Sequence, residues 1–216
     1  MKTALIICNG APVSKKVFKT VQRKYNTDII CADGGSSVAY KFKVIPKFVI
    51  GDLDSSERKV LNYFRKKGTK IIKLKRQSDT DLEKALKLCK SLNYQRLFII
   101  GFSGKRFDHT ISNISNSLKF ANEFRILLIE KESTIYILSG LNEFSSFKGE
   151  LVSIYSFSPN ALITTSHLKY PLKKETLMFS ERESTSNRSN SNKFSINVEN
   201  GFAILVRSTK NFLVYD

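Results

Sequence analysis

The sequence predicts an α/β domain followed by an all-β domain, on the strength of three observations. Through residue 131, short apolar runs alternate with segments of helical periodicity, which is typical of β-α-β units that build a mostly parallel sheet with helices on both faces. Five glycine-rich or acidic clusters directly follow these apolar runs, as at the ligand crevice of a Rossmann-like sheet. From residue 132 to 216, β-rich runs separated by Gly, Asn, Ser and Pro predict an antiparallel β-sandwich.

Ten segments define the expected α/β domain. The expected strands are residues 4–8, 29–32, 48–50, 71–74, 97–100 and 126–129, and the expected helices are residues 14–25, 56–67, 80–92 and 110–122. Thr80 and Glu83 have the spacing of a capping box, in which each side chain satisfies a free backbone N–H at the helix start.

The expected β-sandwich contains six short runs and no helix. These runs are residues 134–138, 151–157, 161–164, 194–198, 202–206 and 212–215. Residues 184–192 consist almost entirely of Ser, Thr, Asn and Arg, and this composition alone predicts a flexible loop.

The charge of the chain fits either a lysine-rich solvated surface or an anionic partner. The chain has 216 residues, of which 41% are hydrophobic, and a formal net charge of +17. This excess could attract nucleic acid or a small polyanion such as a nucleotide. The lysines are spread along the sequence, and aromatic residues do not alternate with them as a base-stacking surface requires. Charge alone therefore does not predict nucleic-acid binding.

Location and redox state follow from the apolar runs and the cysteines. No run approaches the ~18 apolar residues of a membrane span, and the first apolar run is too short for a signal peptide. Cys8, Cys31 and Cys89 are odd in number and lack metal-ligand spacing. We expect buried thiols in a reducing compartment, and hence a cytoplasmic protein without a membrane partner.

The densest cluster predicts a metal site. Asp52 and Asp54 flank one leucine directly after the apolar run 48–50 and Gly51. Carboxylates are hard oxygen ligands suited to a Mg²⁺ ion that also holds phosphate. An ordinary turn has the same composition, but five such clusters at one sheet edge favour a ligand site.

The remaining clusters carry complementary groups. Asn9 begins a tight turn, and Asp33 could bind metal or sugar beside Gly34 and Gly35, which leave room for phosphate or ribose. In residues 77–81, a carboxylate at a helix start is favoured by the helix dipole. Lys105 and Arg106 offer positive charge to phosphate just before another helix.

Standard nucleotide and hydrolase motifs are absent from the sequence. There is no G-x-G-x-x-G, no complete Walker motif and no serine nucleophile elbow. The functional features that remain are carboxylates, two basic residues and glycine turns, all expected at one edge of the sheet. This combination is typical of Mg²⁺-assisted phosphoryl transfer, which depends on charge neutralisation and positioning.

Six motifs together resemble the thiamine pyrophosphokinase family. They are Ala32-Asp33-Gly34-Gly35, Gly51-Asp52-Leu53-Asp54-Ser55, Gln77-Ser78-Asp79-Thr80-Asp81, the segment 101–109, the segment 164–172 and Ser184-Thr185-Ser186-Asn187. Their order and spacing are similar to the family's, and the resemblance covers almost the whole chain. Three positions depart from the pattern: Ser78 stands where the family often has another aspartate, and Lys105 and His167 stand where it usually has glycine.

The resemblance implies an activity, a partner and a site. Family members transfer pyrophosphate from ATP to the hydroxyethyl group of thiamine, giving thiamine diphosphate and AMP, and are homodimers with thiamine between the subunits. Asp52, Asp54 and Asp81 match the Mg²⁺ ligands, and Arg106 completes the expected catalytic set. The strand-end pattern and the resemblance together place the following residues at ATP or thiamine: Asn9, Asp33, Gly34, Gly35, Gln77, Thr80, Lys105, Asp108, Tyr170, Ser184, Thr185, Ser186 and Asn187.

Two alternatives stay open at this point. A haloacid-dehalogenase-type phosphatase would use Asp52 as a covalent nucleophile, although that fold places its D-x-D on the first strand rather than the third. A basic nucleic-acid-binding protein would explain the charge of +17. It would leave the acidic clusters without a purpose, because they would repel a phosphate backbone.

Overall fold

The computed structural model describes residues 1–75, 78–178 and 181–215 and divides into two compact units. The N-terminal unit is Met1–Lys131 and the C-terminal unit is Glu132–Asp216.

The N-terminal unit is built on a six-stranded sheet in which every strand pair is parallel. Its strand order is β6-β5-β1-β2-β3-β4. The bounds are β1 Thr3–Ile7, β2 Asp28–Ala32, β3 Phe48–Gly51, β4 Lys70–Lys73, β5 Arg96–Ile100 and β6 Arg125–Ile129. The central strands β1, β2, β3 and β5 are almost continuously buried, as expected for a parallel sheet covered on both faces.

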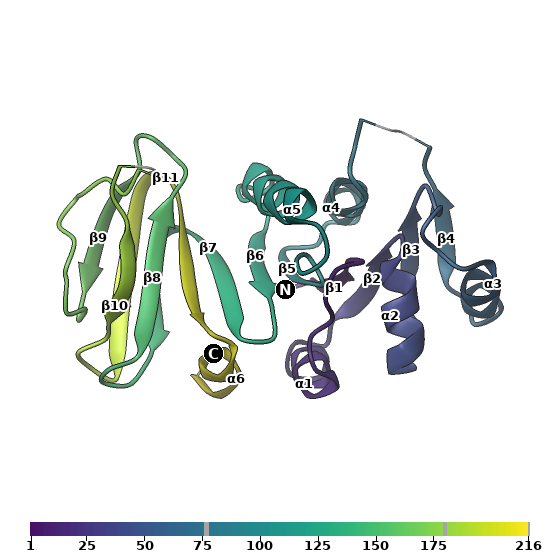
Figure 1. The fold of residues 1–216 in the computed structure, drawn as a ribbon, viewed down its shortest axis with the longest axis horizontal. Helices are drawn as coiled ribbons and strands as arrows, with labels where there is room; N and C mark the ends of the chain where they lie inside the picture. Colours follow the sequence, from purple (N-terminus) through teal and green to yellow (C-terminus); the bar gives the residue numbers. More distant parts are fainter. Residues whose placement is uncertain (76–77, 179–180, 216) are drawn as a thin grey trace. The chain divides into compact units, whose positions relative to one another are not determined.

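Five helices cover the two faces of this sheet: α1 Lys15–Tyr25, α2 Gly35–Phe42, α3 Arg58–Lys66, α4 Asp81–Ser91 and α5 Phe107–Lys119. In Figure 1, α1, α2 and α3 lie on one side of the strands, and α4 and α5 lie on the other. The chain builds the sheet outward from β1 to β4, then returns to place β5 on the other side of β1. Such a reversal opens a crevice at the carboxyl ends of the two strands.

The C-terminal unit is antiparallel in all its strand pairs. Its elements are β7 Ser133–Ser145, β8 Leu151–Ser156, β9 Leu162–Ser166, β10 Ser184–Arg188, β11 Lys193–Ser208 and α6 Thr209–Tyr215. Strand β11 pairs with β7 along its length, but its first half also pairs with β9 and its second half with β8. The register shifts between the halves, where Asn200 and Gly201 have positive φ.

A buried ion pair connects elements of the C-terminal unit. Arg207 of β11 donates from Nε to Glu150 Oε1 at 2.8 Å, and both side chains are 0% exposed. The guanidinium also lies 5.4 Å from the ring centroids of Phe144 and Phe194. Asn211 of α6 donates to the same carboxylate at 2.8 Å, so one anion joins a loop, a strand and a helix.

The predicted fold class is confirmed, since a parallel α/β unit precedes an antiparallel β unit. Helix α2 was not expected, because its first residues have the composition of a turn. Its packing explains that composition: a Cβ at Gly35 would lie 1.9 Å from the carbonyl oxygen of Ile7. Only glycine lets the helix start approach β1 so closely.

Three expectations for the C-terminal unit were wrong. The run 212–215, expected as a strand, belongs to helix α6, in which Phe212 is buried; a short apolar run does not distinguish helix from buried strand. This helix also corrects the expectation of none. Residues 184–188, expected as a flexible loop, form strand β10 against β8. The expected strands 194–198 and 202–206 are the two halves of β11.

Two further expectations concern membranes and cysteines. Within the described parts of the chain, none of the helices has the length and apolar character needed to cross a bilayer. Cys8, Cys31 and Cys89 are buried free thiols, as predicted. Burial raises the pKa of Cys8 and Cys89 to about 12, so both thiols stay protonated at neutral pH.

Candidate active site

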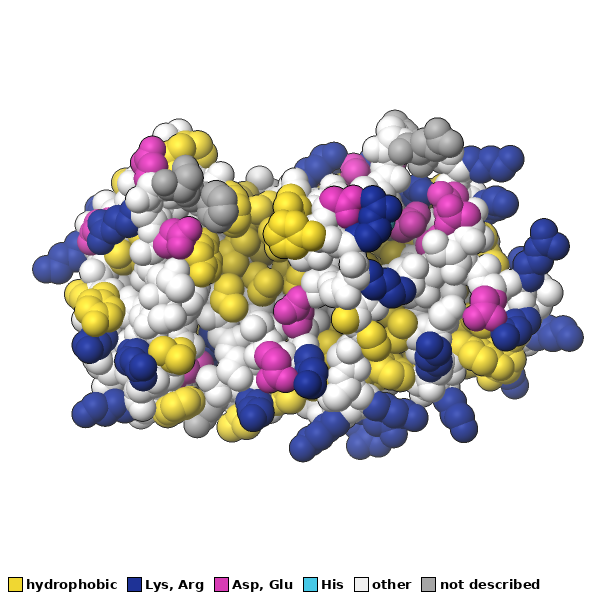
Figure 2. All heavy atoms as spheres, viewed as in Figure 1, with side chains coloured by type: hydrophobic (Ala, Val, Ile, Leu, Met, Phe, Trp, Pro, Cys, Tyr) yellow, Lys and Arg dark blue, Asp and Glu magenta, His cyan; other side chains and the backbone are white. Residues whose placement is uncertain are grey.

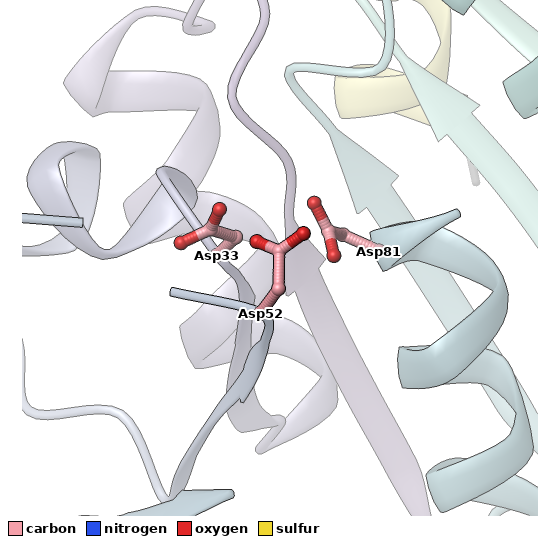
Figure 3. A group of neighbouring side chains, drawn as sticks. All are labelled: Asp33, Asp52 and Asp81. Carbon is pink, nitrogen blue, oxygen red and sulfur yellow. The ribbon is translucent and has the colours of Figure 1, made fainter. Parts of the chain in front are cut away.

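Three aspartates from different loops converge at the carboxyl edge of the parallel sheet. Asp33 follows β2, Asp52 follows β3, and Asp81 is the first residue of α4. One carboxylate oxygen of each lies within 4.8 Å of the others. Figure 3 shows the three side chains turned toward one another. Like charges so close together repel unless a cation or a proton is shared among them.

The backbone and two serines hold Asp33 in place. Its φ of 37° is left-handed, and its N–H donates to Ile50 O at 2.8 Å. Ser56 Oγ donates to Asp33 Oδ1 at 2.7 Å and contacts Ser36 Oγ at 3.0 Å. Burial raises the pKa of Asp33 to about 6, despite the hydrogen bonds from Ser56 and Ser55, and the Asp81 carboxylate adds to the rise. An isolated buried carboxylate is costly, so this placement favours a cationic ligand.

The start of α4 positions Asp81. Thr80 is the N-cap, as predicted, and its Oγ1 accepts from Glu83 N–H at 3.2 Å. The expected reciprocal contact of a capping box is replaced: the Glu83 side chain pairs with Lys87 and Lys119. Asp81 Oδ1 instead accepts from Lys84 Nζ at 2.9 Å.

Asp54 lies beside the three converging aspartates but is not one of them. Leu53 has a φ of 67°, and this left-handed turn leaves the Asp54 side chain exposed. Ser55 Oγ donates to Asp54 Oδ1 at 3.0 Å, and this hydrogen bond lowers the pKa of Asp54. The expected metal set of Asp52, Asp54 and Asp81 therefore differs from the set that converges, in which Asp33 takes the place of Asp54.

The converging oxygens suit Mg²⁺. Three carboxylates are the hard, anionic donor set that this ion prefers. Gly51 keeps the space between them open, because a Cβ there would lie 2.8 Å from Asp33 Cβ and 3.2 Å from Asp81 Oδ1. The donor chemistry and the space both fit a divalent cation.

A second group of predicted residues lies at the ends of β1 and β5. Lys105 Nζ donates to Asn9 Oδ1 at 2.9 Å. The Asn9 amide packs on Gly34, where a Cβ would approach its Nδ2 to 2.4 Å. Gly34 therefore has a packing role, and the Asn9–Lys105 pair spans the switch point of the sheet.

Arg106 and Asp108 are exposed at the start of α5 and pair with each other. Arg106 Nε donates to Asp108 Oδ1 at 3.1 Å. This hydrogen bond lowers the pKa of Asp108 to about 2. Because both side chains are more than 60% exposed, the guanidinium can exchange this partner for an anionic ligand at little cost.

One cavity of about 670 Å³ brings most of these residues together. The predicted residues in its wall are Asn9, Asp52, Thr80, Asp81, Lys105, Arg106 and Asp108. The wall also contains residues that the sequence analysis did not select, among them Lys84, Ser103 and Asn113. The position of Lys84, one helical turn after Asp81, was the only signal for it in the sequence. Gln77 lies outside the described residues.

The predicted residues of the C-terminal unit surround a separate hollow of about 150 Å³. Tyr170, Ser184, Thr185 and Asn187 line it, together with Arg182 and Glu183. Ser186 is not in its wall; it has a φ of 56° and its N–H donates to Ser153 Oγ at 3.0 Å.

Asn187 lines the hollow and also holds the backbone beside it. It is buried, its Nδ2 donates to Tyr170 O at 2.7 Å, and its Oδ1 accepts from Tyr170 N–H at 3.1 Å. The amide therefore holds the backbone of Tyr170, a residue that is 60% exposed. Nearby, His167 has a φ of 59°, a conformation that glycine adopts without strain.

Comparisons with known proteins point to one family. The family model "Thiamin pyrophosphokinase, catalytic domain" matches residues 21–128, and "Thiamin pyrophosphokinase, vitamin B1 binding domain" matches residues 132–203. Thiamine pyrophosphokinase 2 of Arabidopsis thaliana is 30% identical over 186 residues, covering 73% of this chain and 69% of that protein. Thiamine pyrophosphokinase of Saccharomyces cerevisiae is 29% identical over 123 residues, which cover 53% of this chain and 35% of that protein.

Solved structures share the fold. Thiamin pyrophosphokinase from Candida albicans superposes with a TM-score of 0.82 at 18% identity, covering 96% of this chain and 89% of that one. Thiamine pyrophosphokinase from Bacillus subtilis also superposes with a TM-score of 0.82, at 22% identity, and the match covers 96% of this chain and 99% of that one.

Neither alternative function is supported. The D-x-D motif follows the third strand of the sheet, and Asp52 lies among carboxylates instead of standing alone as a nucleophile. On the face shown in Figure 2, the Lys and Arg side chains of the described residues are scattered and do not form one continuous track for a nucleic acid. Both family models describe a thiamin pyrophosphokinase.

Proposed function

Because this chain belongs to the thiamin pyrophosphokinase family, we propose that the cavity of its N-terminal unit binds ATP with Mg²⁺ and transfers pyrophosphate to thiamine. The products are thiamine diphosphate and AMP. The observation that carries the assignment of the site is the convergence of Asp33, Asp52 and Asp81 beside a cavity whose wall also contains Lys105 and Arg106. Anionic metal ligands and cationic side chains beside one cavity are the requirements for holding a metal–polyphosphate complex.

Asp33, Asp52 and Asp81 hold the metal in this proposal, and Asp54 supports them from the exposed side. Bound Mg²⁺ supplies charge neutralisation to the phosphates. Arg106 leaves Asp108 to contact a phosphate oxygen, since its ion pair is exposed. Lys105, held by Asn9 at 2.9 Å, contributes a second positive charge. These residues position the phosphate chain for in-line attack.

The reaction replaces one P–O bond with another. The thiamine hydroxyl oxygen attacks the β-phosphorus of ATP, and the bond from that phosphorus to the oxygen shared with the α-phosphate breaks. AMP leaves with the electron pair of that bond, and the hydroxyl proton is released. Residues 33, 52, 81, 105 and 106 stabilise charge during this transfer, which needs no covalent intermediate.

We assign thiamine to the C-terminal unit. The family model of vitamin B1 binding covers residues 132–203, and the hollow at Tyr170, Ser184 and Thr185 lies within it. Tyr170 offers an exposed ring for stacking, while Asn187 fixes its backbone. In this proposal the protein is a cytoplasmic homodimer with thiamine between its subunits, and nucleic acid is not a partner.

The proposal is tested by identifying the nucleotide product. Purified protein is incubated with ATP, Mg²⁺ and thiamine, and the products are separated by ion-exchange chromatography. We expect thiamine-dependent formation of AMP and thiamine diphosphate in equal amounts. ADP as the product, or AMP formed equally without thiamine, would contradict the proposed function.

A further inference from the structure

Lys84 is an unusual lysine for a protein surface rich in them. Its side chain is only 3% exposed, whereas six other ion-paired lysines are 42% to 77% exposed: Lys47, Lys59, Lys87, Lys90, Lys119 and Lys174. It lies in the wall of the large cavity, and its ammonium group donates to Asp81 Oδ1 at 2.9 Å. Burying a lysine is costly even when it is paired, so stability alone is a poor explanation for its place.

The oxygen that Lys84 contacts belongs to the converging group. A Cβ built on Gly51 would lie 3.2 Å from Asp81 Oδ1 and 2.8 Å from Asp33 Cβ, so this oxygen is directed toward the space between the aspartates. A cation entering that space meets an oxygen already engaged by an ammonium group. The Lys84 charge, on a side chain that is 3% exposed, also repels that cation directly.

We propose that Lys84 is a positioning residue that holds Asp81 and lowers the affinity of the three aspartates for a free divalent cation before the nucleotide arrives. With Lys84 present, one of the three negative charges is balanced, and two remain to meet the metal of a metal–nucleotide complex. Without it, the three aspartates would attract a free divalent cation strongly. The inference rests on the proposed function for the identity of the metal site, and it adds the order in which that site is filled.

The test measures Mn²⁺ binding by electron paramagnetic resonance in the absence of ATP and thiamine, because bound and free Mn²⁺ give different signals. Lys84→Met removes the charge and keeps a chain of similar length. We expect it to bind Mn²⁺ roughly tenfold more tightly than the wild type, since a buried like charge has been removed. A merely structural role for Lys84 would instead weaken binding, because Asp81 would lose its support.

Two controls separate charge from packing. Lys84→Arg keeps the cation and should bind Mn²⁺ within about twofold of the wild type. Lys90→Met removes a charge from the exposed side of the same helix, where Lys90 pairs with Glu123, and should change Mn²⁺ affinity by less than about twofold. Circular dichroism of each variant checks folding, and Lys84→Gln replaces the methionine variant if that one is unfolded.

Unchanged or weaker Mn²⁺ binding by folded charge-neutral Lys84 variants would overturn the inference. The result is independent of catalysis, because neither substrate is present. A wild-type protein that forms no thiamine-dependent AMP would refute the proposed function and leave the Mn²⁺ comparison intact.

Discussion

The negative charges of the buried or clustered carboxylates are balanced fully in one unit and only partly in the other. In the C-terminal unit, Glu150 accepts from Arg207 and Asn211 and is fully buried, with its charge balanced by the guanidinium. In the N-terminal unit, Asp33, Asp52 and Asp81 face one another with a single lysine against one of them. A saturated buried carboxylate serves the fold, whereas carboxylates left in mutual repulsion at a cavity indicate a ligand that the protein still has to bind.

The largest expected effect separates activity from stability. Asp52→Asn keeps the shape of the side chain and removes one metal-binding charge. We expect turnover to fall by about a thousandfold, equivalent to about 4 kcal/mol of transition-state stabilisation. The free energy of unfolding should stay the same or rise, because one like charge has left the group.

Steady-state AMP production and urea unfolding measure the two quantities on the same preparation. The comparison breaks down if Asp52→Asn lowers the free energy of unfolding by more than it raises the activation free energy of the reaction.

Glu150→Gln should show the reverse pattern. It leaves the buried Arg207 guanidinium without its counter-charge, and we expect a loss of about 3 kcal/mol in unfolding free energy. Turnover per folded molecule should stay near that of the wild type, because Glu150 does not line either cavity. Chemical denaturation followed by circular dichroism measures the loss, and an unchanged midpoint would show that the ion pair is dispensable.

Divalent cations should stabilise the N-terminal unit selectively. Mg²⁺ at ten times its dissociation constant adds about 1.4 kcal/mol to the stability of a unit that binds it only when folded. Hydrogen exchange read by mass spectrometry reports on both units in one experiment. We expect slower exchange in the segments around Asp33, Asp52 and Asp81 and no change around Glu150. Equal protection of both units would contradict a metal site confined to the first.

The smallest effect concerns backbone strain beside the small hollow. His167 occupies a left-handed conformation that costs a non-glycine residue about 1–2 kcal/mol. Part of this is offset by the greater flexibility of glycine in the unfolded chain. We therefore expect His167→Gly to stabilise the protein by about 0.5–1 kcal/mol.

Differential scanning calorimetry detects a stabilisation of this size. A lower melting temperature would mean that the contact between Ser166 Oγ and His167 Nδ1, 3.0 Å apart, outweighs the strain.

The parallel sheet and its acidic edge could be predicted from the sequence because both depend on local patterns. Apolar runs mark buried strands, and polar residues that follow such runs meet at one edge of the sheet. The choice among aspartates could not be predicted in this way. Whether Asp33 or Asp54 joins Asp52 depends on the left-handed turn at Leu53 and on Ser56 holding Asp33. These are tertiary details that residue spacing does not encode.

Other differences between expectation and structure have physical causes of the same kind. Residues 184–188 have a composition typical of loops, but backbone pairing with β8 and the buried amide of Asn187 make them a strand. Lys84 was overlooked because a lysine one turn after an aspartate is usually an exposed helix pair. Only the packing of α4 against the sheet shows that its ammonium group is buried beside a cavity.

The reversal of the sheet at β1 has a consequence for how the protein acquires its activity during synthesis. The cavity draws on residues from Cys8 to Asn113, so a nascent chain that has formed only β1 to β4 lacks most of the cavity wall. Parallel strands joined by long crossovers form slowly, because distant segments must lose chain entropy to meet before their contacts can stabilise the sheet. Substrate binding can therefore begin only after β5 has inserted beside β1, late in the folding of this unit. Ligand-dependent refolding rates would then report on the docking of that one strand.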